Sequence, residues 1–158
     1  MTVALLREKF YAAYNSISGG CKYANELVKL HLIKSYCLSL LMYCIGAIDL
    51  PKYKIKDLSV CWNDCFRKIF KFQRWESVGE VQYFCHELPF DLFYDLSRWN
   101  FLSIAVQPVS VDFLRHFILD NKLHRDNFIL KYGDYVSLPA MRRGIWQFFG
   151  SRFDAHEA

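Results

Sequence analysis

The stretch from Lys22 to Trp75 places the tightest constraint on how this chain can fold. It holds two segments with helical spacing of apolar residues, joined by Asp49-Leu50-Pro51. The first includes an uncharged apolar run of 14 residues, Ser35 to Ile48, and the second carries lysines and arginines beside its apolar face. Because proline is tolerated only in the first turn of a helix, Pro51 marks the start of the second helix. The stretch therefore predicts two apolar-faced helices joined by a short link.

Helical spacing continues through the rest of the chain. A first helix is expected to end at Ser18-Gly19-Gly20, and Asn25 is a suitable N-cap for the second. Further helices are expected to begin near Ser77 (in the capping-box pattern Ser-x-x-Glu), Pro89, Ser110 and Pro139. Only residues 128–136 have the alternation of a strand. The fold class expected is all-α.

The third helix, about 52–71, has the clearest core face. Its apolar positions recur at helical spacing, at Ile55, Leu58, Trp62, Cys65, Phe66 and Ile69. This spacing predicts that Trp62 and Phe66 lie in the core rather than on a stacking surface. The second helix becomes apolar on nearly all sides from Tyr36 onward, which predicts burial all round.

Composition limits the cellular setting. The run from Ser35 to Ile48 is shorter than the ~18–20 residues that span a bilayer, so we expect a buried helix and no membrane partner. Six cysteines lie within apolar helical patterns, as reduced thiols in intracellular proteins do. A nuclear or cytoplasmic location is expected. Hydrophobic residues make up 53% of the chain, which favours either a thick core or surfaces that pack against a partner.

Charge is divided unevenly along the chain. Residues 1–75 contain 12 Lys and Arg against 5 Asp and Glu, a net charge of +7. Residues 76–158 contain 8 against 11, a net charge of −3, so the halves together give the overall +4. This asymmetry favours an anionic partner for the first half, although solvated helix faces would leave the same pattern.

The sequence offers little for catalysis. Two-metal nucleotide transfer needs clustered carboxylates, and the chain contains no Asp-Asp pair. Cys61, Cys65, Cys85 and His86 lack the spacing of a zinc knuckle, and the pair on the third helix is expected to be packed and reduced. Gly19-Gly20 lacks the Lys-Ser/Thr partner of a phosphate loop. We expect no catalytic residue, metal or cofactor.

Four segments carry a family resemblance. They are KFYAAYNSI (9–17), SYCLSLLMYCIGAIDL (35–50), LSVCWNDCFRKIFKF (58–72) and RWESV (74–78). Their order resembles the region that follows the polymerase active site in reverse transcriptases of non-LTR (LINE-type) retrotransposons, over roughly residues 7 to 107. The resemblance implies a thumb-like three-helix unit at 1–72 and a post-thumb helical region at 73–107. It also implies a non-catalytic part, because the family's catalytic carboxylates precede this region. Beyond residue 107, helical spacing alone predicts a helical tail of unknown role at 108–158.

Cations interleaved with aromatic residues are the candidate binding site. They are Lys52, Lys54, Lys56, Arg67, Lys68, Lys71 and Arg74. Several of them are expected along one flank of the third helix, where lysine and arginine would neutralise phosphates without reading sequence. By the resemblance, the partners are an RNA/DNA duplex and the palm domain of a parent polymerase. Two alternatives stay open: a helical protein-interaction module, and a decayed fragment with no function of its own.

Overall fold

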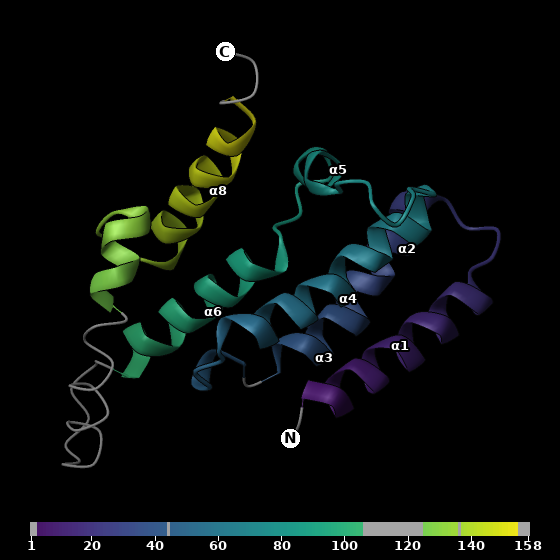
Figure 1. Ribbon diagram of the computed structural model, residues 1–158, viewed down its shortest axis with the longest axis horizontal. Helices are drawn as coiled ribbons and strands as arrows, with labels where there is room; N and C mark the ends of the chain where they lie inside the picture. Colours follow the sequence, from purple (N-terminus) through teal and green to yellow (C-terminus); the bar gives the residue numbers. More distant parts are fainter. Residues whose placement is uncertain (1–2, 44, 106–124, 136, 155–158) are drawn as a thin grey trace.

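A computed structural model describes residues 3–43, 45–105, 125–135 and 137–154 (Figure 1). The described residues are helical and contain no strand, which confirms the all-α fold class. In chain order the elements are α1 (Val3–Gly20), α2 (Glu26–Ile33), the π-helical η1 (Lys34–Leu38), α3 (Ser39–Met42), the 3-10 turn η2 (Ile45–Ala47), α4 (Lys52–Phe70), α5 (Gly79–Phe84), α6 (Phe90–Ala105), a helix over 125–132 and α8 (Leu138–Asp154).

The first 70 residues form a three-helix unit. Figure 1 shows α1, the continuous helix through α2, η1 and α3, and α4 running side by side. Their buried side chains make one apolar cluster with Trp62 and Phe66 fully buried inside it. The two rings meet edge to face with centroids 5.1 Å apart. The prediction that these residues are core is confirmed.

The expected helix boundaries are close to those observed. The Asn25 side chain accepts a hydrogen bond from the Leu27 N–H at 2.9 Å, so Asn25 is the N-cap of α2 as predicted. Pro51 is extended and immediately precedes α4. The link between the helices is longer than Asp49-Leu50-Pro51, because α3 ends at Met42 and η2 follows. The Tyr94 hydroxyl fixes this link by donating to the Ile48 carbonyl and accepting the Leu50 N–H, each at 3.0 Å.

The predicted burial of the second helix on all sides is wrong. Cys37, Leu38 and Leu41 are buried, but Tyr36 is 64% exposed and Tyr43 is 67% exposed. The side that faces α1 and α4 is packed, whereas Tyr36 and Tyr43 lie on the surface of the described residues. An apolar run alone does not show how many helices surround it.

A second apolar cluster joins α6, the helix over 125–132 and α8. The alternation at 128–136 does not mark a strand in the described residues, because residues 125–132 are helical. Phe128 and Tyr132 lie one helical turn apart and both are buried in this cluster. The Tyr132 hydroxyl donates to Asp95 on α6, and the Lys131 ammonium lies 2.7 Å from the same carboxylate. These tertiary contacts favour a helix that local alternation did not indicate.

The remaining predicted helix starts agree with the observed starts to different degrees. α6 and α8 begin within a residue of Pro89 and Pro139. α5 begins at Gly79 with Val78 at the N-cap, so the expected capping box is not formed, and the Ser77 hydroxyl instead accepts the Gly79 N–H at 3.4 Å. The helix expected from Ser110 lies outside the described residues. The division at 72 and 107 stays a prediction.

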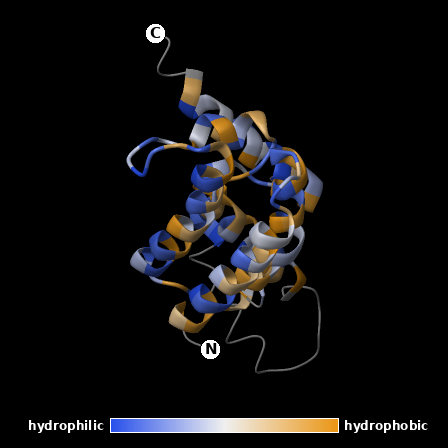
Figure 2. Cartoon of the chain, turned by 90° about the vertical axis from the view of Figure 1, so that its right-hand side faces the viewer, coloured by the Kyte–Doolittle hydropathy of each residue, from blue (hydrophilic) through white to orange (hydrophobic). Residues whose placement is uncertain are grey.

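Hydropathy follows the packing. In Figure 2 the helices carry both hydrophobic (orange) and hydrophilic (blue) residues, as expected of helices buried along one side. By length and composition alone, the helical stretch Glu26–Ala47 is apolar enough to cross a membrane. In the fold 41% of that window is buried, and Leu30, Ile33, Cys37 and Leu41 pack into the first cluster.

Candidate nucleic-acid interface

The predicted cations of α4 fall into two groups. Lys52, Lys54 and Lys56 occupy its first turns, whereas Lys68 is in its last turn and Lys71 caps it. A rise of 1.5 Å per residue places Lys54 and Lys68 about 21 Å apart along the axis. At about 100° per residue, Lys54 and Lys56 also point to nearly opposite sides of the helix. The cations therefore do not form the single row expected from the sequence.

The chain turns sharply where α4 ends. Lys71 has a left-handed backbone with φ of 60°, and its N–H donates to the Arg67 carbonyl, as does the N–H of Phe72 at 2.9 Å. This is the pattern of a helix C-cap in which glycine is usual. The end of α4 is thus closed by backbone hydrogen bonds. The Lys71 side chain is exposed at the helix end.

A tight turn over residues 73–76 follows. The Glu76 N–H donates to the Gln73 carbonyl at 3.1 Å, and the Glu76 carboxylate accepts the Gln73 N–H in return. These two bonds leave Arg74 and Trp75 as the central residues of the turn, both exposed.

Arg67 anchors this turn to α4. Its Nε and Nη2 both donate to the Glu76 carbonyl oxygen at 3.3 Å, and its Nη1 lies 3.2 Å from the Asp64 carboxylate. Asp64 also accepts the Tyr11 hydroxyl from α1 at 3.0 Å. Although Arg67 is one of the predicted phosphate ligands, its guanidinium is engaged within the fold. It is better described as a residue that positions Arg74 and Trp75.

Two open concavities meet at Lys68. One, of about 390 Å³, lies where the end of α1, the start of α2 and the end of α4 converge, and its cations are Lys22, Lys29, Lys68 and Lys71. The other, of about 540 Å³, is lined by Asp64, Arg67, Lys68 and Arg74 with Val60 and Phe72. We name the five cations Lys22, Lys29, Lys68, Lys71 and Arg74 the basic end. Within the described part of the chain, none of the five forms an ion pair.

Aromatic rings hold the central lysine. The Lys68 ammonium lies 4.9 Å from the centroid of the Tyr14 ring and 5.4 Å from that of Tyr11. Each ring face is attractive to a cation without neutralising it. Lys68 is thereby fixed in position and keeps its full positive charge for an anion at the mouth of both concavities.

The sequence did not single out Lys22 and Lys29. They come from the turn after α1 and from α2, and only the packing of the three helices brings them beside the end of α4. The Lys29 ammonium donates to the Lys22 carbonyl at 3.2 Å, which draws the two together. The uneven charge of residues 1–75 was their only signal. Conversely, Lys52, Lys54 and Lys56 lie at the other end of α4, away from both concavities.

Comparison with family models, curated proteins and solved structures finds no match.

The cysteines of α4 belong to the core. Cys61 and Cys65 are buried, and their thiols donate to the Asp57 and Cys61 carbonyls at 3.5 Å. Burial raises the pKa of both thiols, which disfavours the thiolate that binds metal. In the described ranges no three His, Cys, Asp or Glu side chains are grouped to hold a metal ion.

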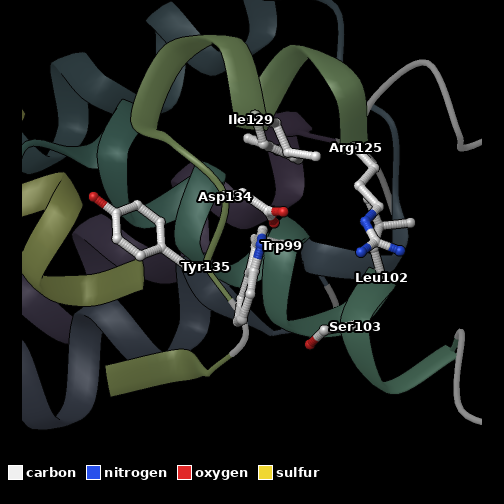
Figure 3. A pocket seen from close by; sticks show the side chains of 8 residues that line it. Trp99, Leu102, Ser103, Arg125, Ile129, Asp134 and Tyr135 are labelled. Carbon is white, nitrogen blue, oxygen red and sulfur yellow. The ribbon is translucent and has the colours of Figure 1, made fainter. Parts of the chain in front are cut away.

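A further cavity lies between α6 and the helix over 125–132. It has a volume of about 240 Å³ and is lined by Trp99, Leu102, Ser103, Arg125, Phe128, Ile129, Asp134 and Tyr135 (Figure 3). Its two charged residues, Arg125 and Asp134, are of opposite sign. This cavity therefore lacks the excess of cations found at the basic end. A polyanion is better accommodated at the basic end than in this cavity.

Proposed function

We propose that the basic end binds the phosphate backbone of a nucleic acid duplex, and that the chain is a thumb-like, non-catalytic part of a non-LTR retrotransposon reverse transcriptase. The observation that carries the proposal is the position of Lys68, where two cation-lined concavities meet. Lysines from α2, from α4 and its C-cap, and from the turn after α1 surround this point, and none of them forms an ion pair with a carboxylate among the described residues. A surface of this kind attracts phosphates along a strand.

The role follows from what the surface contains. Lysine contacts to phosphates fix position and orientation but carry no base information. The chain has no Asp-Asp pair for metal-dependent transfer. Its part in a polymerase is therefore to hold a primer-template duplex, with the chemistry supplied by another region. Template-directed nucleotide incorporation by the purified chain would overturn this assignment.

A pair of triple variants tests the site. Lys22, Lys68 and Lys71 are replaced by alanine in one variant, and Lys52, Lys54 and Lys56 in the matched control. Both variants remove three positive charges. None of the six lysine side chains is buried in the core: five are exposed, and Lys54 is partly exposed. Affinity for a blunt RNA/DNA duplex is measured by fluorescence anisotropy across a series of salt concentrations.

The expected result is a change in salt dependence confined to the first variant. Each lost phosphate contact lowers the slope of log affinity against log salt by about 1, so Lys22/Lys68/Lys71→Ala should lower it by about 3. Lys52/Lys54/Lys56→Ala should lower it by less than about 1. Equal losses in the two variants would show that only net charge matters and would contradict a localised site.

A second candidate function is a protein-interaction module, favoured by the exposed side of α2, η1 and α3. Leu27, Val28, Tyr36 and Tyr43 are all more than half exposed there. Such a surface is typical of a protein contact, which for a polymerase part would be the palm domain. Apolar association is insensitive to salt or strengthened by it, in contrast to duplex binding. Salt-resistant self-association that is abolished by Tyr36→Ser and Tyr43→Ser would support this function. A decayed fragment would show neither this association nor salt-dependent duplex binding.

A further inference from the structure

The basic end also presents two bare aromatic side chains. Tyr23 is 95% exposed and Trp75 is 82% exposed, the highest values for aromatic residues in the described part of the chain. Tyr23 lines the concavity that holds Lys22, Lys29, Lys68 and Lys71, while Trp75 follows Arg74 in the turn. Both come from turns at the same end of the three-helix unit (Figure 1).

The turn that carries Trp75 is rigidly held. Two hydrogen bonds close it between Gln73 and Glu76, and the Arg67 guanidinium ties it to α4. An indole in a fixed frame loses little conformational freedom when a ligand stacks on it. Arg74 is next to Trp75 in the same turn. It lines the 540 Å³ concavity, and Lys68 lines both this concavity and the neighbouring one. A flat apolar surface is thus placed next to a group of cations.

Binding to the phosphate backbone of a nucleic acid requires cations but not the exposed aromatic rings that lie beside them here. Within a duplex the paired bases are stacked on one another, and only the terminal pairs have a free face, so exposed aromatic rings gain little along its length. Unpaired bases have free faces, and proteins that bind single strands combine a cationic groove with aromatic stacking surfaces. We propose that the basic end takes a duplex with an adjoining unpaired segment, with an unpaired base stacked on Trp75 and the neighbouring phosphates held by Arg74 and Lys68. This inference rests on the proposed function of the same surface.

The experiment compares two substrates of the same sequence: a blunt RNA/DNA duplex, and that duplex with a short single-stranded extension. Binding of the full chain is measured for wild type, Trp75→Ala and Trp75→Phe. Phe84→Ala is the matched control, because Phe84 is an equally bare aromatic residue, 78% exposed, on α5 outside the basic end. Substitution at such exposed positions leaves the core intact.

Trp75→Ala is expected to weaken binding of the extended duplex about 5- to 150-fold, the range measured for a lost stacked base, and to change blunt-duplex binding by less than about twofold. Trp75→Phe should retain most of the affinity, and Phe84→Ala all of it. Equal affinity of the wild type for both substrates, or equal losses on both in Trp75→Ala, would overturn the inference while leaving backbone binding intact. Absence of salt-dependent binding to the blunt duplex would overturn the proposed function itself.

Discussion

The indole N–H of Trp62 donates to the carbonyl oxygen of Leu88 at 3.0 Å. Trp62 lies at the centre of the first apolar cluster, whereas the Leu88 side chain belongs to the second. The hydrogen bond is buried and joins α4 to the segment that leads into α6. One tryptophan thus both fills the three-helix core and fixes the position of the next helix against it.

Trp62→Phe should destabilise the fold by about 2–4 kcal/mol. The shorter ring leaves space in a fully buried site, and the Leu88 carbonyl loses its partner. Urea denaturation followed by circular dichroism should show a lower midpoint with an unchanged slope. Trp75→Phe is the control, since the exposed Trp75 should change stability by less than about 0.5 kcal/mol. Equal stability of the two variants would contradict the central packing role of Trp62.

Gly46→Ala should also destabilise the fold, here by about 1–3 kcal/mol. A Cβ on Gly46 would lie 2.6 Å from the Ser97 carbonyl oxygen on α6, and that backbone atom cannot rotate away. Gly19→Ala is the opposite case: nothing lies within 4 Å of its added Cβ, and it sits in α1. Alanine there should stabilise by roughly 0.5–1 kcal/mol because it costs less conformational entropy in a helix. Thermal unfolding of both variants should give midpoint shifts of opposite sign.

Much of the fold follows from local patterns. Helical spacing located α4 and its core face, and Asn25, Pro89 and Pro139 marked helix starts to within two residues, because capping and proline geometry act over a few residues. Burial and secondary structure that depend on tertiary neighbours could not be predicted from local patterns. Tyr36 belongs to an apolar run but is largely exposed among the described residues, and Tyr132 lies in a helix that packs on Asp95. Both outcomes are decided by tertiary contacts.

The candidate site shows the same division. Lys68 and Lys71 were identifiable from a run of cations and aromatic residues. Lys22 was not, because it reaches the site only when α1 and α2 pack against α4. Arg67 has the residue type of a phosphate ligand, yet its bonds to Glu76 and Asp64 give it a different task. Residue type predicts what a side chain can do, and packing determines which partner it meets.

Lys71→Gly should raise stability while weakening duplex binding. Lys71 has φ of 60°, a conformation that costs about 1 kcal/mol for a residue with a Cβ and nothing for glycine. The variant should therefore gain up to about 1 kcal/mol in urea denaturation. The same change removes one cation of the basic end, so the salt slope for duplex binding should fall by about 1. A stabilised variant with unchanged salt dependence would exclude Lys71 from phosphate contact.

The buried thiols predict alkaline sensitivity. Burial raises the pKa of Cys37 from 9.0 to about 11, and it raises the pKa of Cys61 and Cys65 as well. In the unfolded chain these thiols ionise near pH 9, so ionisation favours unfolding above that pH. The stabilisation is present below pH 9 and is lost as the pH rises toward about 11. Circular dichroism should therefore show constant stability near neutral pH and a decline between those values.

Thiol labelling provides a residue-level check on that packing. At neutral pH the half-exposed Cys21 and Cys85 should react faster with a maleimide than Cys37, Cys61 and Cys65, because burial blocks access and disfavours the thiolate. Mass spectrometry of peptides from briefly labelled protein resolves the individual sites. Rapid labelling of Cys65 in the folded chain would contradict the packing of α4.

Arg67→Lys separates the two roles that a cation can have at the basic end. Lysine keeps the charge but cannot donate two parallel hydrogen bonds to the Glu76 carbonyl, so the turn that carries Trp75 should loosen. Affinity for a duplex with a single-stranded extension should fall roughly 3- to 10-fold, as expected for the loss of about one ordinary hydrogen bond, while the salt slope stays unchanged. Lys68→Met should do the converse and lower the slope by about 1 on both blunt and extended duplexes. If Arg67→Lys instead lowered the salt slope as Lys68→Met does, Arg67 would contact phosphate directly, and its bond to the turn would be incidental to binding.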